Sequence, residues 1–157
     1  MKIREDLDIF FMEKALLQAE KSFKRDEIPI GAIVVAPDGK TILSEAHNLT
    51  EQRKCQAAHA EILAIEKACK KMNDWRLNNC TIYVTLEPCA MCMNLILLTR
   101  ISKVVFAVKS KIFGFSLDKY NTFEIYKTPM LIRENICVQN SLNLLKSFFK
   151  SKREKSE

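Results

Sequence analysis

The chain has 157 residues, of which 48% are hydrophobic, and it carries a formal net charge of +6 at pH 7. This length suits one domain with a buried core, so we expect a single domain over residues 1–157. Six cysteines behind a charged start indicate reduced thiols or metal ligands in a cytoplasmic protein. The longest apolar run, residues 95–98, is far below the roughly 20 residues of a membrane span, which excludes membrane contact. None of the three glycines forms a phosphate-binding loop, which argues against a nucleotide triphosphate enzyme.

The first third of the chain predicts a helix followed by a hairpin. Apolar residues recur with helical spacing over residues 12–23, and Asp8 lies where it can cap the start of that helix. The apolar run 30–35 predicts a strand. Residues 37–39, Pro-Asp-Gly, predict the turn that leads into a second strand over 41–46.

Helices and strands then alternate, which implies right-handed crossovers and a central sheet with helices on both faces. We therefore expect an α/β fold with three layers, α/β/α, and a mixed sheet of five strands. A basic helix over about 139–155 ends the chain. The remaining predicted elements are a helix from near Ala58 to Asn73, a strand over 81–85, a helix from Pro88, and strands over 103–108 and 131–138.

Two short motifs carry side chains that can bind a metal ion and move a proton. One holds His59 and Glu61, and the other holds Cys89 and Cys92 directly after Pro88. One imidazole and two thiolates suit Zn²⁺ and leave a fourth tetrahedral position open for water, whose pKa zinc lowers from about 15.7 to about 7. Glu61 can take that water's proton and pass it to a leaving group. In this order the residues form the known signature of the zinc-dependent hydrolytic deaminases.

The expected helices support the metal interpretation. Cys89 and Cys92 share one helix face at spacing i, i+3, and the positive end of the helix dipole stabilises thiolates. Side chains at i and i+2 do not share a face, so His59 and Glu61 can both reach the metal only at the tip of their helix.

Less specific interpretations of these residues stay open. A closed structural zinc site would need a fourth ligand, for which Cys55, Cys80 and His47 are the nearby candidates. Cys55 follows the polar stretch 51–54, which we expect to be a loop. We expect three cysteines to be small buried hydrophobic residues: Cys69, Cys80 and Cys137.

Over residues 8–152 the chain resembles the bacterial tRNA-specific adenosine deaminases of the cytidine-deaminase-like fold. The phrase Thr-Leu-Glu-Pro-Cys and the basic, aromatic tail are more similar to these enzymes than to free-base deaminases. The matching stretches are Glu27-Ile28-Pro29-Ile30-Gly31-Ala32, Ala58-His59-Ala60-Glu61-Ile62, Trp75-Arg76-Leu77, Tyr83-Val84-Thr85-Leu86-Glu87-Pro88-Cys89, Met91-Cys92 and Arg100-Ile101-Ser102-Lys103-Val104-Val105-Phe106.

The resemblance implies a role for each matching residue. His59, Cys89 and Cys92 would hold one zinc ion per chain, Glu61 would shuttle the proton, and Asn48 would hydrogen-bond the target base. It also implies a homodimer that converts the first anticodon base of an arginine tRNA to inosine, with the anticodon stem-loop as partner. Where the family usually has an Asp near the substrate ribose, this chain has Ser110, which carries no charge.

The composition of the C-terminal tail, residues 139–157, also favours RNA binding. Residues 139–157 hold five Lys or Arg against two Glu, and Phe149 can stack on an unpaired base. A solvated terminal helix that packs Phe148 on the core is the simpler interpretation of the same residues. Two other functions stay open: deamination of a free base or nucleoside (guanine, cytosine or cytidine) at the same zinc site, and a non-catalytic RNA-binding subunit with structural zinc.

Overall fold

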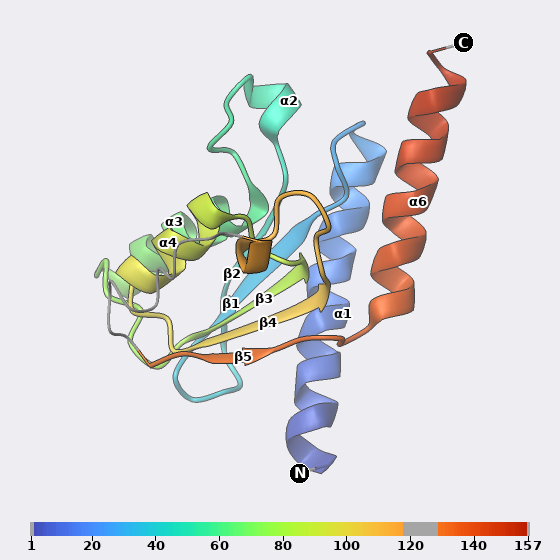
Figure 1. Ribbon diagram of the computed structural model, residues 1–157. Helices are drawn as coiled ribbons and strands as arrows, with labels where there is room; N and C mark the ends of the chain where they lie inside the picture. The colour runs from blue at the N-terminus through green and yellow to red at the C-terminus, as the bar shows by residue number, and fades with distance from the viewer. Residues whose placement is uncertain (1, 118–128, 157) are drawn as a thin grey trace.

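The computed structural model describes residues 2–117 and 129–156, and its strands form one sheet in the order β2-β1-β3-β4-β5 (Figure 1). None of the described helices is long and apolar enough to cross a membrane. The elements are α1 (Lys2–Lys24), β1 (Gly31–Val35), β2 (Ile42–His47), α2 (Thr50–Arg53), α3 (Ala60–Met72), β3 (Thr81–Leu86), α4 (Ala90–Leu98), β4 (Lys103–Val108), the 3-10 helix η1 (Phe115–Leu117), β5 (Leu131–Arg133) and α6 (Val138–Glu154).

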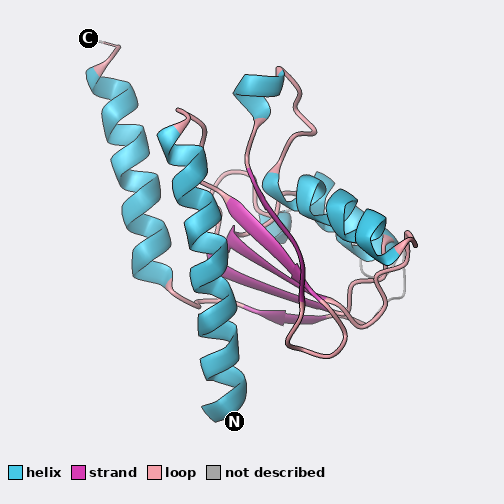
Figure 2. Ribbon diagram, turned by 180° about the vertical axis from the view of Figure 1, so that it is seen from behind, coloured by secondary structure: helices cyan, strands magenta, loops and turns pink. Residues whose placement is uncertain are grey.

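The sheet is mixed, and helices cover both of its faces. β1 pairs antiparallel with β2 and with β3, whereas β3–β4 and β4–β5 pair parallel. Helices α1 and α6 lie side by side on one face, and α3 and α4 cover the other (Figures 1 and 2). The predicted three-layer α/β/α fold with five strands is confirmed.

The strand directions decide where the loops gather. Because β2 and β3 both run antiparallel to β1, they run parallel to each other and to β4, and their carboxyl ends lie at one edge of the sheet. The chain enters α3 after β2 and α4 after β3, so both helices begin at that edge. Residues far apart in the sequence therefore meet there.

The alternation of side chains along each central strand builds two hydrophobic cores. On β3, Ile82 and Val84 belong to the core under α3 and α4, whereas Tyr83 belongs to the core under α1. Gly31 brings α1 close to the sheet, because a Cβ at this position would lie 2.0 Å from the backbone oxygen of Ala15.

The predicted helix cap at Asp8 is wrong. Helix α1 begins at Lys2, so Asp8 lies within the helix, where its side chain is buried. Its carboxylate accepts hydrogen bonds from the Tyr83 hydroxyl at 2.7 Å and from Lys103 Nζ at 2.7 Å, and it pairs with Arg133. Asp8 thus connects α1 to three strands, since a buried carboxylate needs such partners.

Two further predictions need correction. The fifth strand, predicted over 131–138, ends at Arg133, because Asn135 and Cys137 adopt left-handed φ angles of 68° and 58° that no strand accommodates. The stretch 51–54, predicted as a loop, contributes most of the single-turn helix α2. The predicted C-terminal helix over 139–155 corresponds to α6 (Val138–Glu154).

Replacing Asp8 tests the contact between α1 and the sheet. Asp8→Ala should lower the free energy of unfolding by about 2–3 kcal/mol, less than the ~3–5 kcal/mol typical of a broken buried pair because Lys103 and Arg133 reach solvent. Urea denaturation measures this loss. Glu66→Gln, which removes an exposed pair with Lys70, is the matched control and should change stability by no more than about 0.5 kcal/mol. Equal effects from the two variants would contradict the assignment.

Candidate metal centre

His59 and Cys89 stand directly in front of α3 and α4 as their N-cap residues. Both have extended backbone angles, with ψ of 148° at His59 and 169° at Cys89, so the helices begin two residues later than the predicted starts at Ala58 and Pro88. Cys92 lies on the first turn of α4. With His59 outside the helix and Glu61 in its first turn, both side chains can face one point although they are only two positions apart.

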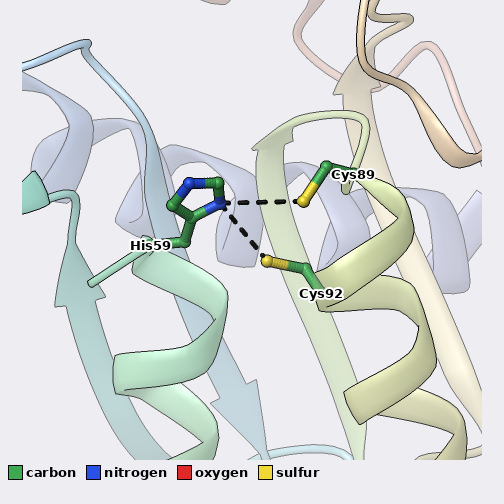
Figure 3. Close-up of side chains that lie close together, drawn as sticks. All are labelled: His59, Cys89 and Cys92. Carbon is green, nitrogen blue, oxygen red and sulfur yellow. Dashed lines mark hydrogen bonds between the residues drawn. The ribbon is translucent and has the colours of Figure 1, made fainter. Parts of the chain in front are cut away.

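The three candidate ligands converge (Figure 3). His59 Nδ1 lies 3.7 Å from Cys89 Sγ and 3.5 Å from Cys92 Sγ, and all three ligand atoms are within 4.8 Å of one another. A tetrahedral zinc with Zn–N of about 2.0–2.1 Å and Zn–S of about 2.3 Å would place its nitrogen and sulfur ligands about 3.5 Å apart. The side chains therefore lie close to the spacing that zinc requires.

Within residues 2–117 and 129–156 the candidate metal site has three protein ligands and no fourth. Cys55 is exposed, Cys80 is buried, and His47 lies with Nδ1 3.3 Å from the backbone oxygen of Asn48. None of the three joins the group. A three-ligand set leaves a coordination position for water or substrate, as in catalytic zinc sites. Of the cysteines predicted to be buried, only Cys80 is fully so, because Cys69 and Cys137 are half-buried.

The two sulfurs divide the roles of donor and acceptor. A hydrogen bond from Cys92, reinforced by His59, lowers the pKa of Cys89 to about 4. The same hydrogen bond, together with burial, raises the pKa of Cys92. Metal ligands must be thiolates, so metal binding would release the proton that the two sulfurs share.

Glu61 lies beside these ligands with one oxygen unsatisfied. Its side chain is buried, and burial raises the pKa of its carboxyl group to about 7. Among the described residues, its Oε2 atom is buried without a hydrogen-bond partner. A buried polar atom of this kind is costly unless a further group pairs with it. The soft donor set and this oxygen both fit a zinc ion that carries a water molecule.

Asn48 follows β2 at the same edge of the sheet. Its Nδ2 donates to Glu27 Oε2 at 3.2 Å, and its Oδ1 accepts from the Thr50 hydroxyl at 2.9 Å, so the orientation of the amide is fixed. The next residue, Leu49, donates its N–H to the backbone oxygen of Ala58 at 3.0 Å, which ties this segment to the start of α3.

Ser110 and Phe149 have different surroundings. Ser110 follows β4, again at the shared edge, and its hydroxyl accepts the Phe113 N–H at 3.2 Å. Phe149 lies on α6 with 45% of its surface exposed, whereas Phe148 is buried against Phe23. The segment that follows Ser110 is described as far as residue 117, and residues 118–128 lie outside the described part of the chain.

Two buried carboxylates that shape the site, Glu27 and Glu87, were not predicted from the sequence. Glu27 accepts the backbone N–H groups of Glu51 and Gln52 in addition to Asn48. Glu87 accepts two backbone N–H groups of the loop after β4. A signal was present, because both lie in stretches that match the deaminases.

The comparisons with known proteins agree with this geometry. Residues 5–108 match the family described as the cytidine and deoxycytidylate deaminase zinc-binding region. The chain belongs to this family. It is 39% identical over 145 residues to the tRNA-specific adenosine deaminase of Aquifex aeolicus, covering 92% of this chain and 95% of that protein. The predicted resemblance to the tRNA-specific adenosine deaminases is thereby confirmed.

Two solved structures extend the comparison. A structure from a study of A-to-I editing by tRNA:A34 deaminases is 32% identical, with a TM-score of 0.79, and the match covers 87% of this chain and 99% of that one. Guanine deaminase from Bacillus subtilis is 30% identical, with a TM-score of 0.62 and coverage of 68% and 71%. The deaminase chain thus carries the zinc-binding region of its family, and His59, Cys89 and Cys92 are the group that could hold the metal.

Removing one candidate ligand tests the metal centre. Cys89→Ala should purify with little zinc, because an imidazole and one thiolate do not complete the site. Cys55→Ala, which alters an exposed cysteine outside the group, should keep one zinc per chain. Elemental analysis of the purified proteins measures both values, and full zinc content in Cys89→Ala would rule out this ligand set.

Proposed function

We propose that this deaminase converts adenosine to inosine at the first anticodon position of a tRNA, with an arginine tRNA as substrate. The observation that carries the proposal is the three-ligand group beside a buried Glu61, in a chain that is 39% identical to a tRNA-specific adenosine deaminase. The anticodon stem-loop is the proposed partner. A homodimer in the cytoplasm completes the proposal.

The reaction replaces the amino group at C6 of adenine with oxygen from water and releases ammonia. When bound by His59, Cys89 and Cys92, zinc supplies a water molecule of lowered pKa. Glu61 would accept a proton from the attacking water and deliver it to N1 of the ring as the water oxygen bonds to C6. It would then move the proton of the new hydroxyl to the amino nitrogen as the C–N bond breaks, so that ammonia leaves, inosine keeps N1–H and one carboxylate serves both transfers. Burial suits this role, because it raises the pKa of Glu61 to about 7.

Asn48 is the proposed contact to the target base. Glu27 and Thr50 hold its amide in one orientation, which leaves the second N–H of Nδ2 and the second lone pair of Oδ1 for a base edge. A fixed amide favours a base whose donors and acceptors match it. We therefore assign Asn48 to substrate binding.

The RNA would also contact α6. Lys152, on the same helix, pairs with Asp26 at 2.6 Å and lies over the Phe148 ring, so α6 is fastened to the end of α1. Phe149, exposed on this helix, is the proposed stacking residue. Phe148, by contrast, is buried, as expected if it packs on the core and does not contact RNA.

Incubation with tRNA tests the proposed function directly. Wild-type protein should produce inosine at the first anticodon position of an arginine tRNA and turn over guanine, cytosine and cytidine slowly or not at all. Phe149→Ala should weaken binding of the stem-loop by about 1–3 kcal/mol if the ring stacks on a base. Rapid turnover of guanine, with no inosine in tRNA, would replace this proposal with the free-base alternative.

Glu61 can be tested apart from the metal. Glu61→Ala should keep zinc and the fold, because the carboxylate is not in the ligand group, but lose at least about 10²–10⁴-fold in turnover. Inosine formation and zinc content are measured on the same sample. Glu66→Gln, on an exposed position of the same helix, is the control and should retain full activity. A near-normal rate in Glu61→Ala would remove the shuttle assignment.

Ser110 provides a test of sugar recognition. The Ser110→Asp variant should hold or improve activity on an anticodon stem-loop RNA, because aspartate can still accept the Phe113 N–H and restores the charge that the family usually has there. If the missing charge relaxes ribose recognition, the wild type should also deaminate the matching DNA stem-loop, and Ser110→Asp should suppress that activity. Equal RNA-to-DNA ratios in both proteins would exclude a role for this position in discrimination.

A further inference from the structure

Glu87 is a buried carboxylate that the proposed chemistry does not use. It lies at the end of β3, directly before Pro88 and Cys89, with 3% of its surface exposed. No Lys, Arg or His of the described residues forms an ion pair with it at 4.0 Å or less. A buried charge without a cation is costly unless hydrogen bonds satisfy it. The groups that donate hydrogen bonds to Glu87 therefore indicate its role.

Both oxygens of Glu87 accept backbone N–H groups of one loop, residues 110–117. Ser110 N donates to Oε2 at 2.9 Å, and Ser116 N donates to Oε1 at 3.0 Å. Its own N–H donates to the backbone oxygen of Val108 at 2.7 Å, which completes the pairing of the two strand ends. One side chain therefore holds the loop at both of its ends.

The same loop also contacts the segment that carries the candidate metal ligands. Phe115 N donates to the Pro88 oxygen at 2.9 Å, and Gly114 forms an isolated antiparallel bridge with Cys89. A Cβ at Gly114 would lie 2.3 Å from Glu87 Oε2, so the carboxylate rests directly against this glycine. The loop and the Cys89 turn form one unit with Glu87 at its centre.

We infer that Glu87 is a positioning residue that fixes loop 110–117 beside the metal centre in the arrangement that binds substrate. The inference rests on the proposed function for its substrate, the anticodon loop of a tRNA. A carboxylate suits the role because both of its oxygens are acceptors, whereas a glutamine would direct an N–H donor at one of the two loop amides. Glu87 acts through the loop and touches no reacting atom.

Holding the loop by its backbone leaves the tip free to vary. Ile112 and Phe113 at the tip are 75% and 74% exposed, and the two hydrogen bonds that Glu87 accepts from the loop both come from backbone N–H groups. Side chains over 110–113 can therefore set substrate preference while the backbone stays in place. This accommodates Ser110 at the position where the family usually has an Asp.

Glu87→Gln and Gly114→Ala test the inference from its two sides. The first removes an acceptor, and the second keeps the carboxylate but places a methyl group against it, which forces the loop and the Glu87 side chain apart. Amide hydrogen exchange over 110–117 should become about 10-fold faster or more in both, as expected for the loss of one hydrogen bond to a charged group. KM for an anticodon stem-loop RNA should rise about 10-fold, with kcat changed less and zinc content unchanged. Glu134→Gln, which removes the exposed partner of Lys109 beside this loop, should leave every value unchanged.

Each alternative outcome has a separate meaning. Unchanged hydrogen exchange in Glu87→Gln would show that Glu87 does not hold loop 110–117. Faster exchange with unchanged KM would show that holding the loop does not contribute to substrate binding. Loss of zinc in Glu87→Gln would assign the residue to the metal centre instead. If the wild type forms no inosine in RNA, the proposed function fails by itself. In that case the role of Glu87 is decided by comparing KM of the wild type and Glu87→Gln. The substrate is then whichever of guanine, cytosine or cytidine the protein deaminates.

Discussion

The site depends on one topological constraint, the parallel direction of β2, β3 and β4. Asn48 follows the first of these strands, Glu87 the second and Ser110 the third, so all three lie at the edge where the strands end. The two helices that begin at this edge place His59 and Cys89 in front of their N-termini. The chain thereby assembles a nitrogen and two sulfurs within 4.8 Å of one another from segments 30 and 33 positions apart.

Buried carboxylates then fix the surroundings of that edge. Glu27 accepts from Asn48 and from the first turn of α2, and Glu87 accepts from loop 110–117. Both accept hydrogen bonds from backbone amides rather than from cations, and Glu27 also accepts the side-chain amide of Asn48, so their charges hold main-chain positions. Asp8 differs, because it is paired with Lys103 and Arg133 and ties α1 to the sheet. Glu61 is the exception among the buried acids of the described residues, since one of its oxygens has no partner there.

The hydrogen-bond partners distinguish the buried acids that hold the main chain from Glu61, the acid proposed to move a proton. In Glu27 and Glu87 both carboxylate oxygens accept hydrogen bonds, whereas Glu61 is buried with one oxygen unpartnered among the described residues. Burial raises the pKa of Glu61 to about 7, which places proton gain and loss near neutral pH. The contrast with Glu27 and Glu87 explains how neighbouring acids in one site can have different tasks.

The sequence by itself determined the local chemistry. The identity and spacing of His59, Glu61, Cys89 and Cys92 predicted a zinc ligand set with an acid beside it, and hydrophobic periodicity located β1 to β4 within one or two residues. The tertiary structure decided what depends on distant contacts. Asp8 appeared to be a helix cap because its partners Tyr83 and Arg133 lie 75 and 125 positions away. Glu87 appeared only as part of a motif, since its role comes from backbone amides 23 and 29 positions further on. Every residue but proline has a backbone N–H, so the sequence does not show which amides Glu87 binds. Hydrophobic periodicity likewise could not show that β5 ends early, because left-handed residues such as Cys137 interrupt a stretch whose apolar pattern continues.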